Sequence, residues 1–120
     1  MTSRTLDSIL ADMCELPVFI GVEVSSPNCR SILGDYPLHI AVVQDDIEAV
    51  GLLIANGAKV NSLGEHGYTP LHEVVEQGHH NIACLLMDSG ADVNVKNNDG
   101  VSALEFAMGV ADTSMQEIVA

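Results

Sequence analysis

The chain has 120 residues, 48% of them hydrophobic, which is enough for one domain whose core needs no disulfide or metal to hold it together. Aromatic residues make up only 3% and tryptophan is absent, so we expect a core of Leu, Ile, Val, Ala and Met, which suits closely stacked helices better than a β-sandwich. With 17 acidic residues against 4 basic ones and a net charge of −13, the chain lacks the Lys and Arg that bind phosphates, so we expect neither nucleic-acid nor membrane binding.

Residues 1–33 are predicted to form an N-terminal capping segment, a helix followed by a hairpin. Four apolar residues lie at helical spacing on one side of the helix: Leu6, Ile9, Leu10 and Met13. Pro17 ends the helix, the stretch 18–24 is predicted to be a strand, and 25–30 a turn. The helix would cover the apolar flank of the next unit and the hairpin would replace a missing finger. A separate functional arm is the alternative.

Beyond residue 33 the sequence repeats itself in steps of 33 residues. The segment DYPLH at 35–39 recurs as YTPLH at 68–72 and, more faintly, as VSALE at 101–105. Other landmarks keep the same step: Gly34, Gly67 and Gly100; Leu52-Leu53 and Leu85-Leu86; Gly57-Ala58 and Gly90-Ala91; Val60-Asn61 and Val93-Asn94. The predicted copies are 34–66, 67–99 and a truncated 100–120.

Each full copy is predicted to contain two short helices and a projecting finger. Pro37 and Pro70 lie at the first turn of the first helix, where a missing N–H is tolerated. Gly57 and Gly90 follow the second helix, because glycine accepts the left-handed conformation of a C-cap. The Asn- and Gly-rich stretch that comes next, 59–66 in the first copy, is interpreted as a turn or small hairpin.

These motifs resemble those of the ankyrin-repeat family. The family pattern of Thr-Pro-Leu-His, a paired-Leu helix, Gly-Ala and Val-Asn is similar to YPLHIAVVQDDIEAVGLLIANGAKVN and YTPLHEVVEQGHHNIACLLMDSGADVN. The resemblance implies an all-α repeat fold (α-solenoid) of helix-turn-helix repeats with β-hairpin fingers. In the third copy Ala103 and Glu105 replace Pro and His, and the chain stops before any Gly-Ala. We expect this copy to be a C-terminal cap whose outer face is polar, at Ser114, Gln116 and Glu117.

The sequence contains no arrangement typical of catalysis or metal binding, such as a Ser-His-Asp order, an HExxH motif or a Walker loop. The resemblance implies a structural role for His39 and His72. Adjacent histidines, His79 and His80, point to different sides of a helix start and cannot chelate one ion together. We therefore expect no enzyme activity, no cofactor and no metal.

A binding surface remains as the expected functional feature. The resemblance implies that partners are bound by finger residues around the repeat's Gly and by the two residues that close the first helix. Carried onto this sequence, the predicted binding residues are Asp35, Val43 and Gln44, then Leu63, Glu65, His66, Tyr68, Glu76 and Gln77, and finally Asn98, Asp99 and Val101. Tyr68 would be an aromatic anchor and Leu63 an exposed apolar contact, with local packing of either as the alternative.

The acidic charge predicts a basic protein partner whose approach it steers, or it serves only to keep the protein soluble and monomeric. Small acidic ankyrin proteins resemble the immunity proteins that bacteria encode beside secreted toxins, often nucleases, which implies an inhibitor. The alternatives are a regulatory adaptor or scaffold, and a fragment of a larger ankyrin protein.

Three cysteines, with no CxxC spacing, predict buried free thiols in a reducing compartment: Cys14, Cys29 and Cys84. The sequence has no apolar stretch of membrane-spanning length, and its start is too short and too acidic for a secretory signal. We expect a cytoplasmic protein.

Overall fold

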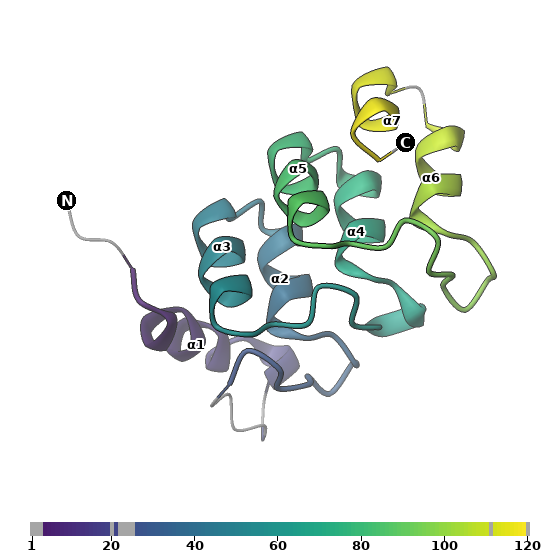
Figure 1. Cartoon of the computed structure of the whole chain (residues 1–120). Coiled ribbons are helices and arrows are strands. Elements are labelled where there is room, and N and C mark those ends of the chain that lie inside the picture. Colours follow the sequence, from purple (N-terminus) through teal and green to yellow (C-terminus); the bar gives the residue numbers. More distant parts are fainter. Residues whose placement is uncertain (1–3, 20, 22–25, 111, 120) are drawn as a thin grey trace.

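The computed structural model describes residues 4–19, 21, 26–110 and 112–119. The helices of this part are α1 (Leu6–Cys14), α2 (Pro37–Val43), α3 (Ile47–Ala55), α4 (Pro70–Gln77), α5 (His80–Asp88), α6 (Ala103–Gly109) and α7 (Thr113–Val119). They stack in two rows: α2, α4 and α6 form an inner row, and α1, α3, α5 and α7 an outer one (Figure 1). The described residues contain no strand, and the predicted all-α repeat fold is confirmed.

Local chemistry sets where the inner helices begin. Thr69 and Ser102 are extended N-cap residues, and their side-chain oxygens accept hydrogen bonds from the backbone N–H groups of His72 and Glu105. Pro37 and Pro70 occupy the first helical position, as predicted, because their missing N–H would have had no partner inside the helix. The start of each inner helix is therefore determined by residues of its own repeat.

The core lies between the two rows of helices. Leu53 of α3 and Leu86 of α5 are 0% exposed and lie 33 positions apart, and Leu38 and Leu71 are equally enclosed in the inner row. Burying one such side chain contributes about 1.5–3 kcal/mol. Because each repeat is only two short helices thick, these leucines stabilise the module by contact with neighbouring repeats.

The N-terminal helix covers the first repeat on its outer side. Ile9, Leu10 and Met13 are buried, and α1 packs against α3. The prediction of a strand from residue 18 is wrong at its start, because Pro17–Phe19 is a 3₁₀-helix, η1, whose last residue donates its N–H to the carbonyl of Leu16 at 3.0 Å. This turn places the Phe19 ring in the core at 1% exposure. Residues 20 and 22–25 of the predicted hairpin lie outside the described residues.

The fingers of the described chain are turns, the second with a short 3₁₀-helix, η2 (Glu65–Gly67), rather than the β-hairpins that we expected. The same hydrogen bond closes each one: Ser31 N–H to Asp35 O at 2.7 Å, Gly64 N–H to Tyr68 O at 2.8 Å and Asn97 N–H to Val101 O at 2.9 Å. One isolated bridge, between Lys96 and Ser102, replaces a ladder. A closed turn satisfies these backbone groups, so the finger needs no strand pairing.

The last helix forms the C-terminal end of the outer row. Met115 and Val119 are buried, and α7 packs on α5. Ser114 and Glu117 are exposed as predicted, but Gln116 is half-buried. Its amide donates to the carbonyls of Ala107 and Val110 at 3.0 and 2.9 Å, which caps the end of α6.

The prediction of buried thiols is wrong for two cysteines. Cys14 and Cys84 are exposed, because α1 and α5 turn other apolar residues toward the core. Cys29 is half-buried, and its sulfur lies 3.7 Å from the Ser26 hydroxyl.

Candidate partner-binding surface

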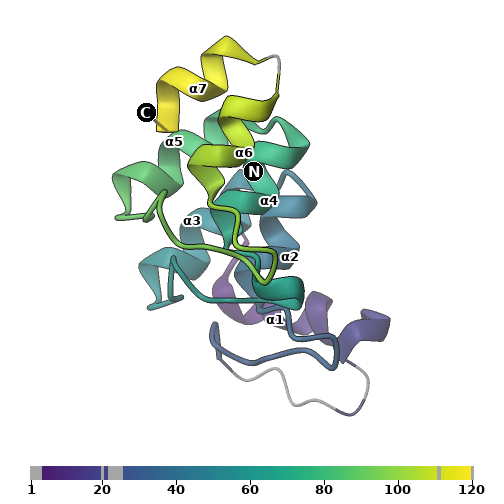
Figure 2. The same ribbon diagram turned by 90° about the vertical axis from the view of Figure 1, so that its right-hand side faces the viewer.

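Hydrogen bonds between adjacent loops hold the fingers together. The Asn61 side chain donates to Gly90 O at 3.2 Å and accepts from Asp92 N–H at 2.8 Å. Asn28, 33 positions earlier, repeats both contacts with the Gly57 carbonyl and the Lys59 N–H, at 3.0 and 3.1 Å. Figure 2 shows the loops that follow α3 and α5 running side by side. The fingers therefore form one continuous edge instead of independent loops.

Two buried histidines connect this edge to the inner helices. His39 and His72 each accept a hydrogen bond at Nδ1 from the backbone N–H of the N-cap residue, at 3.1 and 3.0 Å. Their Nε2–H groups donate to the carbonyls of Tyr68 and Val101, both at 2.8 Å. Burial lowers the pKa of each imidazole, which favours the neutral ring that these bonds require. This geometry gives the two histidines the structural role that the resemblance implied.

Most of the predicted binding side chains lie on the surface. The exposed ones are Val43, Gln44, Leu63, His66, Glu76, Gln77, Asn98 and Asp99; the half-buried ones are Asp35, Glu65, Tyr68 and Val101. Two of the half-buried residues support the fingers: Asp35 Oδ1 accepts from Glu65 N–H at 2.8 Å, and the Val101 carbonyl accepts from His72. Asp35 and Val101 therefore position neighbouring residues through hydrogen bonds, and their contact with a partner remains a prediction.

The tip of the second finger has an unusual backbone. His66 has a left-handed φ of 61° and its side chain is 75% exposed. Its carbonyl accepts a hydrogen bond from Asn98 N–H at 3.0 Å, which fixes the tip against the third finger. Left-handed residues other than glycine are costly and concentrate at functional sites.

An aromatic cluster lies where the fingers meet the inner helices. The Tyr68 ring centroid is 5.5 Å from that of Phe106 and 5.4 Å from that of His72, and His72 and Phe106 are 5.2 Å apart. Sequence reasoning identified Tyr68 but missed Phe106. The repeat step could have pointed to Phe106, because it stands on inner helix α6 one repeat, 33 residues, after Glu73 of α4.

A groove of about 410 Å³ opens beside this cluster, between α4 and α6. It is lined by Tyr68, Glu76, Glu105, Phe106, Gly109 and Val110. Two of these are predicted binding residues, and the structure adds the other four. No side chain fills the groove at Gly109, since a Cβ placed there would have no atom within 4 Å.

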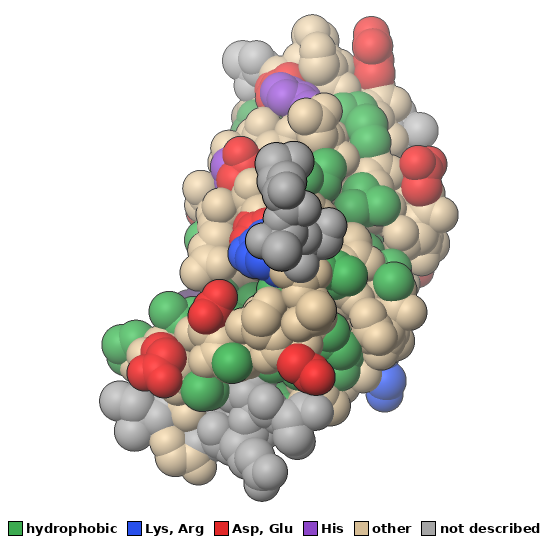
Figure 3. Space-filling view, turned by 90° about the vertical axis from the view of Figure 1, so that its left-hand side faces the viewer, with side chains coloured by type: hydrophobic (Ala, Val, Ile, Leu, Met, Phe, Trp, Pro, Cys, Tyr) green, Lys and Arg blue, Asp and Glu red, His purple; other side chains and the backbone are tan. Residues whose placement is uncertain are grey.

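Carboxylates of α4 and of the first two fingers, including the groove residue Glu76, lie close enough together to repel one another. Burial and, to a lesser extent, the carboxylates of Asp35, Glu76 and Glu65 together raise the pKa of the Glu73 carboxyl to about 7. Burial likewise raises the pKa of the Tyr68 hydroxyl, and the nearby Glu76 carboxylate raises it further. Acidic side chains are also scattered over the opposite side of the molecule (Figure 3). A nearby cation would relieve the repulsion around Glu73.

The tip of the first finger carries apolar side chains that sequence reasoning missed. Ile32 is 63% exposed and Leu33 53%, and Leu63 of the second finger is 47% exposed. Ile32 and Leu33 stand 33 positions before Glu65 and His66, so the repeat step pointed to them. We call the exposed tips together with the groove the finger face: Ile32, Leu33, Leu63, Glu65, His66, Asn98 and Asp99, plus the groove-lining residues.

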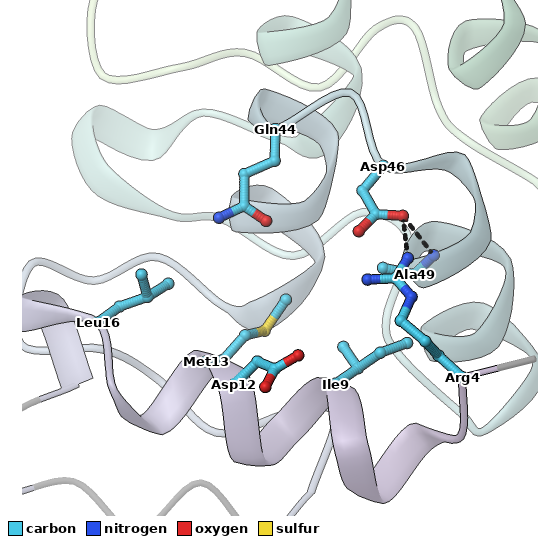
Figure 4. A pocket seen from close by; sticks show the side chains of 8 residues that line it. All are labelled: Arg4, Ile9, Asp12, Met13, Leu16, Gln44, Asp46 and Ala49. Carbon is cyan, nitrogen blue, oxygen red and sulfur yellow. Dashed lines mark hydrogen bonds and ion pairs between the residues drawn. The ribbon is translucent and has the colours of Figure 1, made fainter.

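A second, smaller cavity of about 170 Å³ belongs to the attachment of α1 (Figure 4). The Arg4 guanidinium forms ion pairs there with Asp46 and Glu48 of the first repeat. These contacts hold the pKa of the Asp46 carboxyl below its usual value. Ile9 and Met13 line the same cavity, so its walls are the interface between the N-terminal helix and the stack.

A family model described as ankyrin repeats, in three copies, matches residues 10–97. The match begins inside the segment predicted to be a cap. A search of curated proteins found no match. Among the described helices, none is long and apolar enough to cross a membrane. The described side chains also contain no group of three or more His, Cys, Asp or Glu that could hold a metal ion.

Proposed function

Because the chain belongs to the ankyrin-repeat family, whose repeats imply a protein–protein interaction module, we propose that it binds a basic protein through the finger face. The observation that carries this proposal is the groove between α4 and α6, where aromatic rings and carboxylates lie together. Aromatic residues in a partly enclosed setting concentrate binding energy, and the surrounding carboxylates select a cationic partner. The apolar tips at Ile32 and Leu33 extend the contact area along the fingers.

The finer form of the proposal is that binding sequesters and inhibits the partner. A net charge of −13 attracts a basic protein from a distance and speeds its capture. A nuclease-type toxin has a basic cleft for phosphates, and an acidic finger face would block it by mimicking the charge of the substrate. Under this proposal the protein acts as an immunity protein. An adaptor or scaffold would share the fold, but the rate at which it associates with its partner would not depend on charge.

Salt dependence tests the proposal and separates these two forms. A tagged protein would be used to isolate its partner from the source cell, and association would then be measured between about 50 and 300 mM salt. We expect the association rate to fall steeply with salt, because screening removes steering. A rate that does not change would assign the acidity to solubility and favour the adaptor. The gene of a toxin would lie beside the gene of its immunity protein, and loss of the latter would be lethal only in the presence of the former.

A further inference from the structure

We propose that the groove between α4 and α6 receives one arginine side chain of the protein partner. This inference rests on the proposed function and specifies the chemistry at its centre. The volume of the groove, about 410 Å³, falls within the range of roughly 300–1,000 Å³ that is typical of small-ligand pockets. The groove can therefore hold a long side chain together with the backbone that flanks it.

The walls of the groove suit the stem and the planar head of arginine. Phe106 and Val110 provide apolar surface for the methylene groups, and the rings of Tyr68 and Phe106, 5.5 Å apart, favour a cation near them. Gly109, the last residue of α6, lines the groove without a side chain, and a Cβ placed there would meet no atom within 4 Å.

The charges around the groove select a cation that binds more than one carboxylate. Glu76 of α4 and Glu105 of α6 line it, both are exposed, and no lining residue is basic. The Ser102 hydroxyl donates a hydrogen bond to Glu105 at 3.3 Å, which positions that carboxylate, and the Glu76 carboxylate lies close enough to the Tyr68 hydroxyl to raise its pKa. A guanidinium has five donors in a fixed plane, whereas an ammonium is a compact and strongly hydrated charge. Arginine is therefore favoured over lysine.

Among the residues that the structure describes, none of the four Lys and Arg side chains forms an ion pair with Glu76 or Glu105. Arg4 pairs with Asp46 and Glu48 on the outer side of the first repeat. Arg30 donates to the Gly34 carbonyl at 3.1 Å and lies 5.9 Å from the centre of the Tyr36 ring, at the first finger. The partner must therefore supply the cation.

Short peptides test the groove directly. The ¹⁵N-labelled protein would be titrated at about 50 mM salt with capped Gly-Gly-Arg-Gly-Gly and with matched peptides that carry Lys or citrulline in place of Arg. We expect amide shifts concentrated at Tyr68, Phe106, Gly109 and Val110, and binding about tenfold tighter for Arg than for uncharged citrulline. Equal shifts with Arg and citrulline, or shifts spread evenly over the acidic surface, would overturn the proposal.

A pair of glycine variants supplies the matched control. Gly109→Leu places a bulky side chain at a position that lines the groove without removing a charge, and Gly51→Leu places the same side chain on outer helix α3, where a Cβ also meets no atom within 4 Å. We expect Gly109→Leu to weaken Arg-peptide binding about tenfold and Gly51→Leu to leave it unchanged. If Gly109→Leu fails to fold by circular dichroism, Glu76→Gln combined with Glu105→Gln replaces it, with Glu117→Gln as its control. If Gly109→Leu, or the double variant that replaces it, binds the Arg peptide as tightly as the native protein, the inference is wrong.

The isolated partner separates this inference from the broader proposal. If Gly109→Leu leaves partner affinity unchanged while changes at Tyr68 and Glu65 lower it, the groove does not bind an arginine of the partner. The finger face would then still be the binding surface. If neither change affects partner affinity, both proposals fail.

Discussion

His72 and Val101 are linked by a 2.8 Å hydrogen bond from the imidazole Nε2–H to the backbone carbonyl. This bond joins an inner helix to the finger of the following repeat, and the His39–Tyr68 pair repeats it one repeat earlier. The two bonds place Tyr68 and Val101 at the junction between the fingers and the inner helices, where Tyr68 lines the groove.

Replacing His72 with Ala should destabilise the fold. His72 is 0% exposed, and its removal leaves the Thr69 N–H and the Val101 carbonyl without these partners. Each unsatisfied buried group costs about 1–3 kcal/mol, so we expect a loss in that range or above it in urea unfolding. His66→Asn is the control, since Asn tolerates the left-handed backbone of the exposed tip and should stay within about 0.5 kcal/mol of the native protein. Equal stability of the two variants would contradict the bridging role.

Leu53→Ala and Leu86→Ala should each lower the free energy of unfolding by about 2–5 kcal/mol. Both side chains are fully enclosed between stacked repeats, and truncation leaves a cavity there. Because few repeats share the loss, the whole module is expected to unfold in one transition at lower temperature. Leu63→Ala, at a finger position that is 47% exposed, is the matched control. A melting curve unchanged by Leu53→Ala would refute the assigned packing.

Stability should fall as pH rises through the titration of Glu73. Its pKa in the folded protein is raised to about 7 from a usual value of 4.5, so the folded state binds the proton more tightly than the unfolded chain. The stabilising contribution is complete below about pH 4.5 and is lost between there and about pH 7. Glu73→Gln should therefore stabilise the protein at pH 8 by about 1–2 kcal/mol, a figure reduced for the partial exposure of the group, and have little effect at pH 4.5.

Urea unfolding at both pH values measures this difference. Glu117→Gln removes one exposed carboxylate from α7 and reports the general relief of negative charge. An equal gain at pH 8 in both variants would show that the effect belongs to net charge and not to the environment of Glu73.

Changing Tyr68 and Glu65 together, to Ala and Gln, should weaken the complex with the isolated partner by about 1–2 kcal/mol while the repeat stack stays folded. Tyr68 lines the groove, and Glu65 lies at the tip of the second finger. The double variant therefore changes both parts of the finger face. Calorimetric titration gives the affinity, and circular dichroism confirms folding. Glu117→Gln again controls for charge, and unaltered affinity of the double variant would move the binding site elsewhere.

The sequence by itself determined the elements that depend on short-range chemistry. The step of 33 residues located the helix pairs, Pro70 and Thr69 marked a helix start, and the family resemblance implied a structural role for His39 and His72. These features form within one repeat or recur between similar neighbouring repeats, so a linear pattern contains them.

Only the tertiary structure decided the rest. Phe106 meets Tyr68 because α6 stacks on α4, and the groove is lined by residues that this stacking brings together from both helices. The helical turn that buries Phe19 likewise packs against α1, so an apolar run that resembled a strand became η1. Contacts of this kind depend on distances between elements, which the repeat period does not specify.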